Sequence, residues 1–72
     1  HHRVVRMSGK AERIITDIFT MYQSTPAALP ESVQEFIPQR GLERVICDYI
    51  AGMTDRFAID EHLRLFDPQS LP

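Results

Sequence analysis

Apolar side chains recur along the chain with the spacing of an α-helix in two separate stretches. In each stretch they occupy a first position and then positions 3, 4, 7, 8 and 11 residues further on, which places them along one side of a helix. The first set is Ala11, Ile14, Ile15, Ile18, Phe19 and Tyr22, and the second is Leu42, Val45, Ile46, Tyr49, Ile50 and Met53. Because the residues between these positions differ, we expect two helices of similar shape that pack on each other rather than an internal repeat.

Capping residues and proline mark the ends of these two helices. Ser8 is a candidate N-cap for the first helix, and residues 24–26 (Ser-Thr-Pro) end it. Gly41 precedes the second helix, whose first turn carries Glu43, where a negative charge suits the helix dipole.

Shorter helices are predicted in the remaining stretches. Pro30 suits the first position of a helix over residues 30–37, with residues 38–41 as a loop. Asp60 suits the N-cap of a last short helix. No strand pattern competes, so the sequence predicts an all-α fold of two main amphipathic helices plus one or two short ones.

The length of the chain predicts a marginal core. A domain of 72 residues buries only about 60% of its unfolded surface. The single cysteine, Cys47, excludes an internal disulfide, and no Cys/His cluster offers a zinc site. To be stable, such a domain needs very good helix packing or contact with a larger domain. The chain opens with His1 and His2 rather than methionine, and we expect residues 1–72 to be one domain excised from a longer protein.

Charge argues against nucleic acid as a partner. The net charge is −2, with four cations against one acid in residues 1–13 (+3) and four against nine in the rest (−5). The basic residues within 1–13 can contact a phosphate, although such a run of charges is more often a solvated helix face. An acidic surface does not favour binding to a phosphate backbone. No apolar run approaches the ~20 residues that span a bilayer, and a free cysteine fits a reducing compartment. We therefore expect a cytoplasmic protein.

Polar residues run along the second helix in two neighbouring lines, if that helix continues through residue 57. One line holds Asp48, Gly52 and Asp55, and the other holds Tyr49, Gly52 and Arg56. A tyrosine ring can stack on a sugar or base, and a guanidinium can clamp a phosphate. A glycine inside a helix often admits a close neighbour or a ligand. The structural alternative is a surface pair between Arg44 and Asp48 and tight helix packing at Gly52.

Two other reactive residue types give weak signals. His62 lies next to two acids, but adjacent positions on a helix do not converge on one metal ion. Cys47 lies just beside the apolar side of the second helix, where a buried and inert thiol is expected. Neither residue predicts a metal site or a nucleophile.

Residues 44–66, RVICDYIAGMTDRFAIDEHLRLF, closely resemble the C-terminal region of bacterial deoxyguanosinetriphosphate triphosphohydrolase-like proteins, which belong to the HD-domain phosphohydrolases. The core of the resemblance is DYIAGMTDRFA, residues 48–58, and a run of such mixed chemistry rarely agrees by chance. Residues 4–22 resemble the segment that precedes it in those proteins, and the proline-rich middle fits more loosely. The resemblance covers nearly the whole chain.

This resemblance implies a metal-dependent hydrolase that cleaves a deoxynucleoside triphosphate into a deoxynucleoside and triphosphate. In that family, His and Asp side chains of the HD motif hold a divalent metal that activates water or polarises the phosphate. The present chain has no His-Asp dipeptide. We therefore expect the metal and the catalytic residues in an HD domain upstream, with no catalytic or metal-binding residue in this chain, and no hydrolysis by this chain alone.

Within the matching motif, Tyr49, Asp55 and Arg56 are the candidates for lining or buttressing the nucleotide pocket of the intact enzyme. The partners that the resemblance implies are the upstream HD domain, the deoxynucleoside triphosphate and further copies in a homo-oligomer. The alternative is that the motif is a docking surface. In that case the chain is a helical interaction or oligomerisation module that binds a partner helix.

Overall fold

The computed structural model describes residues 9–67, with side chains from Glu12 onward. Over these residues the chain forms helices and turns and contains no strand. The elements in order are α2 (Gly9–Ser24), the 3-10 turn η1 (Pro26–Ala28), α3 (Glu31–Gln34), α4 (Ile37–Arg40), α5 (Leu42–Ala51) and α6 (Asp55–Phe66). The predicted all-α fold is confirmed, and the expected N-cap Ser8 lies outside the described residues.

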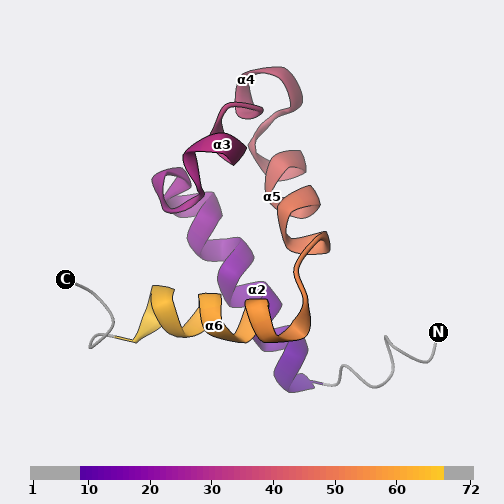
Figure 1. Cartoon of the computed structure of the whole chain (residues 1–72), viewed down its shortest axis with the longest axis vertical. Coiled ribbons are helices and arrows are strands. Elements are labelled where there is room, and N and C mark those ends of the chain that lie inside the picture. Colours follow the sequence, from indigo (N-terminus) through magenta and orange to yellow (C-terminus); the bar gives the residue numbers. More distant parts are fainter. Residues whose placement is uncertain (1–8, 68–72) are drawn as a thin grey trace.

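Helix α2 is the centre of the arrangement, because it packs against both α5 and α6. In Figure 1, α6 crosses α2 at a steep angle at one end of the molecule, and the short helices α3 and α4 connect α2 to α5 at the other end. The three longer helices therefore meet around a single small core.

The core is built from both predicted apolar stripes. Ile18 and Tyr22 of α2 and Ile46 of α5 are fully buried, and Leu29 and Ala58 complete the cluster. Full burial of one large aliphatic side chain contributes about 1.5–3 kcal/mol. The expected packing of the two stripes on each other is confirmed.

The second helix is shorter than its apolar spacing predicts. Helix α5 ends at Ala51, and Gly52 is its C-cap, with its N–H bonded to the carbonyl oxygens of Asp48 and Tyr49 at 3.3 and 3.2 Å. A Cβ atom on Gly52 would meet only these same two carbonyl oxygens, at 3.8 and 3.7 Å. The expectation of a helix-interior glycine that admits a close neighbour is therefore wrong within the described chain.

The last helix starts earlier than predicted. Thr54 caps α6, and its Oγ1 accepts a hydrogen bond from the backbone N–H of Phe57 at 3.1 Å. Helix α6 begins at Asp55 and has 12 residues, so the expectation of Asp60 as its N-cap is wrong. Apolar spacing alone did not show where one helix stops and the next begins.

The middle segment also differs from the prediction. The helix expected over residues 30–37 is two single turns, α3 and α4, separated at residues 35–36, and Pro30 is an N-cap rather than the first helical residue. Pro38 lies in the first turn of α4 instead of a loop, a position where its missing N–H has no partner to lose. Gly41, with φ of 90°, ends α4 and precedes α5 as predicted, in a conformation that favours glycine.

Candidate functional site

The break after α5 separates the three candidate residues. Tyr49 lies in α5 and is half-buried, whereas Asp55 and Arg56 are exposed in the first turn of α6. The predicted line through Tyr49, Gly52 and Arg56 does not exist, because Gly52 ends one helix before the next begins. Neither Asp55 nor Arg56 lines either hollow beside Tyr49. The candidate site is therefore built around Tyr49, with the other two residues on a neighbouring exposed turn.

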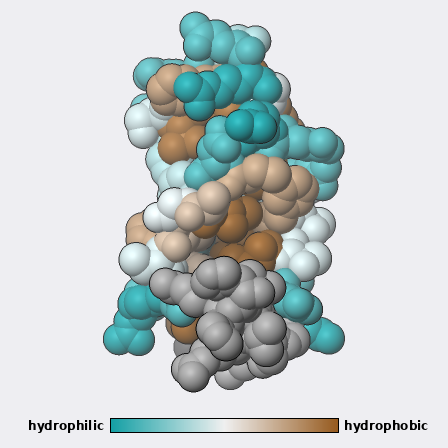
Figure 2. Space-filling view, turned by 90° about the vertical axis from the view of Figure 1, so that its right-hand side faces the viewer, coloured by the Kyte–Doolittle hydropathy of each residue, from teal (hydrophilic) through white to brown (hydrophobic). Residues whose placement is uncertain are grey.

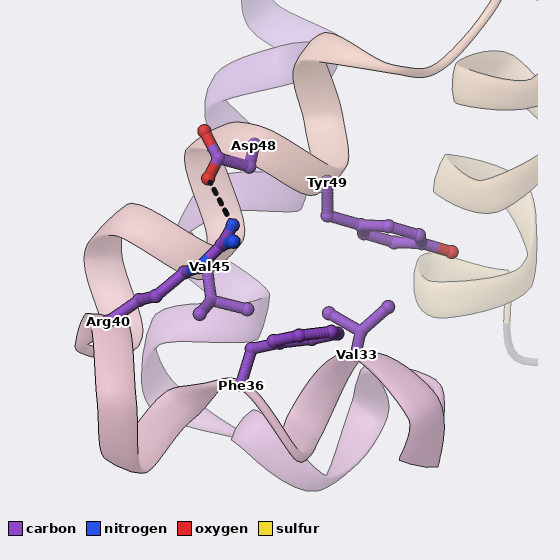
Figure 3. Close-up of a pocket in the computed structure, with 6 residues that line it drawn as sticks. All are labelled: Val33, Phe36, Arg40, Val45, Asp48 and Tyr49. Carbon is purple, nitrogen blue, oxygen red and sulfur yellow. Dashed lines mark ion pairs between the residues drawn. The ribbon is translucent and has the colours of Figure 1, made fainter.

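The first hollow lies between the short helices and α5, with a volume of about 210 Å³. It is lined by Val33, Phe36, Arg40, Val45, Asp48 and Tyr49. Figure 3 shows Val33 and Phe36 pointing from the short-helix side toward α5, while the ring of Tyr49 extends toward a neighbouring helix. The result is an apolar floor with one carboxylate and one guanidinium at its edge.

Arg40 and Asp48 stand at the edge of this hollow, and Arg44, which does not line it, also pairs with Asp48. Asp48 Oδ2 lies 3.5 Å from Arg40 Nη1, and Asp48 Oδ1 lies 3.4 Å from Arg44 Nε. The predicted pair between Arg44 and Asp48 is confirmed, and Arg40 joins it. The Arg40 guanidinium also lies 5.2 Å from the centre of the half-exposed Phe36 ring, which is cation–π range. Among these three charged side chains, two guanidinium groups therefore face one carboxylate.

The second hollow lies beyond Tyr49, where α5 gives way to α6, and has a volume of about 340 Å³. It is lined by Asp48, Tyr49, Gly52, Met53, Thr54 and Phe57. The rings of Tyr49 and Phe57 meet edge to face, with centroids 6.5 Å apart. Asp48 and Tyr49 are shared by both hollows. Figure 2 shows that this side of the molecule, where α5 lies, carries apolar patches between hydrophilic ones.

A buried polar network behind Tyr49 fixes α6 against α2. The Tyr22 hydroxyl donates a hydrogen bond to Glu61 Oε2. Arg64 binds the same carboxylate with Nε and Nη2, at 2.9 and 2.7 Å, and Nη2 also lies 3.3 Å from the carbonyl oxygen of Ala28. The Tyr49 ring packs on that of Tyr22 with centroids 5.8 Å apart. This network thus connects α2, η1, α5 and α6.

The network also sets the protonation of its members. The hydrogen bonds from Arg64 hold the pKa of the Glu61 carboxyl below its ordinary value of 4.5, although burial acts in the opposite direction. Burial, followed by the neighbouring Glu61, raises the pKa of the Tyr22 hydroxyl far above its ordinary value. Burial also raises the pKa of Tyr49, with a smaller contribution from Glu61. At neutral pH the network therefore holds one ionised carboxylate that is paired with arginine and two neutral phenols.

This network was not predicted from the sequence. One indication was present in the sequence: Glu61 and Arg64 are three residues apart, so their side chains are neighbours on a helix. Tyr22 belongs to the apolar stripe of α2, and nothing in that pattern shows which side chain its hydroxyl meets 39 residues later.

The structure also describes the two other reactive residues, His62 and Cys47. His62 Nε2 lies 2.9 Å from Asp17 Oδ2, which joins α6 to α2 a second time. Cys47 is exposed, so the expectation of a buried thiol is wrong. Across residues 9–67, no group of three or more His, Cys, Asp or Glu side chains gathers in a way that could hold a metal ion. The described residues therefore do not fit the metal that the resemblance implies, and we assign no chemical step to a metal held by them.

Helix α6 carries a second surface of note, on a side away from its buried residues Ala58 and Glu61. Ile59, Leu63 and Phe66 follow each other at intervals of four and three residues and therefore lie along one side of the helix. They are 43%, 52% and 42% exposed. We call these three residues the outer stripe of α6.

Comparison with protein families gives one match over most of the chain. The family model described as the phosphohydrolase-associated domain matches residues 1–64. None of the solved structures matches the chain significantly. In the part of the chain that the structure describes, no helix has both the length and the apolar character required to cross a membrane.

Curated proteins similar to this chain share one printed name, deoxyguanosinetriphosphate triphosphohydrolase-like protein. That of Geobacter sulfurreducens is 56% identical over 68 residues, which is 94% of this chain and 18% of that protein. That of Geobacter metallireducens is 54% identical over the same shares. That of Bordetella pertussis is 51% identical over 67 residues, 93% of this chain and 17% of that protein. The chain therefore spans less than a fifth of the length of these relatives.

Proposed function

Because the chain belongs to the phosphohydrolase-associated domain family, as its motif implied, we propose that residues 1–72 are the C-terminal accessory domain of a cytoplasmic, metal-dependent deoxynucleoside triphosphate triphosphohydrolase. The intact enzyme releases a deoxynucleoside and triphosphate from a dGTP-type substrate and assembles as a homo-oligomer. The observation that carries this proposal is the 56% identity over 94% of the chain to a triphosphohydrolase-like protein.

In this proposal the accessory domain packs on an upstream HD domain and helps to line its nucleotide pocket. Tyr49 supports this role because its half-buried ring borders both hollows and is held in place by the rings of Tyr22 and Phe57. A fixed aromatic face of this kind can stack on a base or sugar. Tyr49 thus forms the wall of the pocket that this chain supplies.

Asp55 and Arg56 are proposed to meet the polar part of the nucleotide. Both are exposed in the first turn of α6, and within residues 9–67 no hydrogen bond or ion pair occupies the Arg56 guanidinium. An arginine without a partner can bind a phosphate in bidentate fashion. Asp55 can accept a hydrogen bond from a sugar hydroxyl or a base N–H.

The metal and the attacking water are assigned to the HD domain rather than to this chain. The described residues offer no group of metal ligands, and the chain contains no His-Asp dipeptide. We therefore expect the 72-residue chain alone to release no triphosphate from dGTP with Mg²⁺ or Mn²⁺ present. Metal-dependent release of triphosphate by the purified chain would overturn this assignment.

Kinetics of the longer enzyme that carries this domain test the role of Tyr49. Tyr49→Ala removes the ring, and we expect KM for dGTP to rise about tenfold with kcat within about twofold, because a base–ring contact is worth about 1–3 kcal/mol. Tyr49→Phe keeps the ring and is the matched control, expected to retain most of the affinity. Equal kinetics for Tyr49→Ala and the parent enzyme would contradict the proposal.

A second candidate function is a non-catalytic helical interaction or oligomerisation module, and the exposed apolar outer stripe of α6 favours the interaction form of it. Arg56→Ala separates the two candidates in the same enzyme. A higher KM or lower kcat with assembly intact supports contact with substrate. Unchanged kinetics per folded enzyme, together with loss of oligomer or of thermal stability, supports docking. Arg13→Ala, which removes an exposed arginine on α2, is the control for loss of charge alone.

A further inference from the structure

We propose that the outer stripe of α6, formed by Ile59, Leu63 and Phe66, is the surface on which the HD domain of the same polypeptide docks. The identity of the partner rests on the proposed function, whereas the choice of surface rests on the geometry of α6. This contact joins the accessory domain to the rest of the enzyme.

The stripe is held in a fixed orientation by the contacts on the inner side of α6. Glu61 binds both Tyr22 of α2 and Arg64, and His62 binds Asp17 of α2. The Phe66 ring rests on the His62 ring, with centroids 4.7 Å apart. Because α6 is fixed to α2 at these points, burying the outer stripe requires little further ordering of the helix.

The amount of apolar surface argues for a partner on the same chain. A helix of 12 residues is about 18 Å long and about 10 Å across, so one face covers only ~200 Å². A specific interface between separate proteins buries about 800 Å² on each partner. Such a small stripe can hold a neighbour that is already tethered, because the tether supplies an effective concentration in the millimolar range. A second copy held by this stripe alone would dissociate at ordinary concentrations.

The relatives are long enough to contain such a tethered neighbour. This chain spans only 17–18% of the triphosphohydrolase-like proteins that it matches. In proteins of that length, more than four-fifths of the polypeptide lies outside the segment that contains the stripe. An exposed apolar row in such a segment is expected to pack on the larger body beside it.

Docking on this stripe also explains how an exposed turn can reach the nucleotide. Arg56 precedes Ile59 by three residues and Leu63 by seven, so all three lie on the same side of α6. A domain that covers Ile59 and Leu63 therefore borders Arg56. The stripe brings the first turn of α6 to the edge of the HD domain, where Asp55 and Arg56 can face a bound substrate.

Site-specific photo-crosslinking in the full-length enzyme tests this contact. Leu63 is replaced by the photoreactive residue p-benzoylphenylalanine, and Thr20, an exposed position on α2, carries the same replacement as the matched control. Equal amounts of ¹⁴N- and ¹⁵N-labelled enzyme are unfolded and refolded together before irradiation, so that any oligomer contains both labels, and the crosslinked peptides are identified by mass. We expect position 63 to join a peptide of the HD domain with the same isotope label, at a yield at least tenfold above position 20.

Three results would overturn the proposal. Crosslinks of mixed label from position 63 would identify a second copy as the occupant, crosslinks to a segment outside the HD domain would identify a different contact, and a yield no higher than at position 20 would show an uncovered surface. The readout needs no substrate and no activity. Failure of the Tyr49 kinetics would therefore refute the nucleotide role and leave the docking result standing.

A charge substitution gives a second, independent measurement. Leu63→Glu places a charge in the proposed contact and is expected to lower the thermal midpoint of the full-length enzyme by about 2 °C or more. Thr20→Glu adds the same charge outside the contact and is expected to change the midpoint by less than 1 °C. Equal shifts in the two variants would contradict the proposal.

Discussion

Glu61 and Asp48 are both carboxylates bound by arginine, yet they lie in opposite surroundings. Glu61 is only 7% exposed and is held by Arg64 and the Tyr22 hydroxyl. Asp48 is exposed at the edge of two hollows, with Arg40 and Arg44 at 3.5 and 3.4 Å. Both carboxylates are paired with arginine, but only Glu61 is buried.

The difference separates a structural pair from an available one. A buried carboxylate that loses a partner keeps the full cost of its desolvation, so Glu61 fixes the position of α6. An exposed pair is worth at most about 1 kcal/mol and exchanges readily with water or a ligand. Arg40 and Arg44 are therefore free to leave Asp48 for an incoming anion, whereas Arg64 is committed to Glu61.

Glu61→Gln is expected to have the largest effect on this comparison. It keeps the shape of the side chain and removes the charge that Arg64 binds, so we expect the free energy of unfolding to fall by about 1–3 kcal/mol. Chemical denaturation followed by circular dichroism measures the change. Asp60→Asn, the same chemical change at the adjacent exposed position, is the control and should cost less than about 0.5 kcal/mol. Equal losses in the two variants would mean that the buried carboxylate contributes no more to the free energy of unfolding than an exposed one.

Acid is expected to act through the same carboxylate. The pKa of Glu61 is lower in the folded protein than its ordinary value of 4.5, because Arg64 stabilises the charged form. The stability that this pair supplies is therefore fully present above about pH 4.5 and is lost as the pH falls through the lowered pKa of the folded state. Denaturation curves between pH 7 and pH 3 should show a smaller loss of stability in Glu61→Gln than in the parent protein. Parallel losses in both proteins would show that other groups dominate acid unfolding.

Asp48→Asn should have the smallest effect, although it disrupts two ion pairs. Because both pairs are exposed, we expect the free energy of unfolding to fall by less than about 1 kcal/mol. Salt should reduce the difference further, since exposed charges are screened. Denaturation in low salt and in 0.5 M NaCl measures both effects. A loss as large as that of Glu61→Gln would remove the distinction between the two carboxylates.

The sequence predicted the exposed half of this comparison and not the buried half. The Arg44–Asp48 pair follows from spacing within one helix, and the all-α fold and the α2–α5 core follow from apolar periodicity. The partners of Glu61 come from helices far apart in sequence, and only the three-dimensional crossing of α2 and α6 brings Tyr22 to it. Local patterns do not encode such crossings.

The arrangement of the candidate residues could be predicted only in part, for a related reason. Tyr49 was chosen from its motif and its role stays a prediction; the structure adds Phe36 and Phe57 as further residues that line the two hollows with it. The predicted alignment of Tyr49 with Arg56 was wrong, because the apolar positions keep their helical spacing across the end of α5 at Gly52. The Thr54 hydroxyl, bonded to the N–H three residues later, was the local signal that marks the new helix.

The break between α5 and α6 has a consequence for changes in length. Each residue of an α-helix turns the chain by about 100°, so a residue inserted after Ile59 would rotate Leu63 and Phe66 away from Ile59 and divide the outer stripe. A residue inserted between Met53 and Thr54 falls between α5 and α6 and leaves the angular order within each helix unchanged. The eleven residues of the motif, 48–58, thus belong to two helices with a short connection between them, and only that connection is expected to accept an insertion.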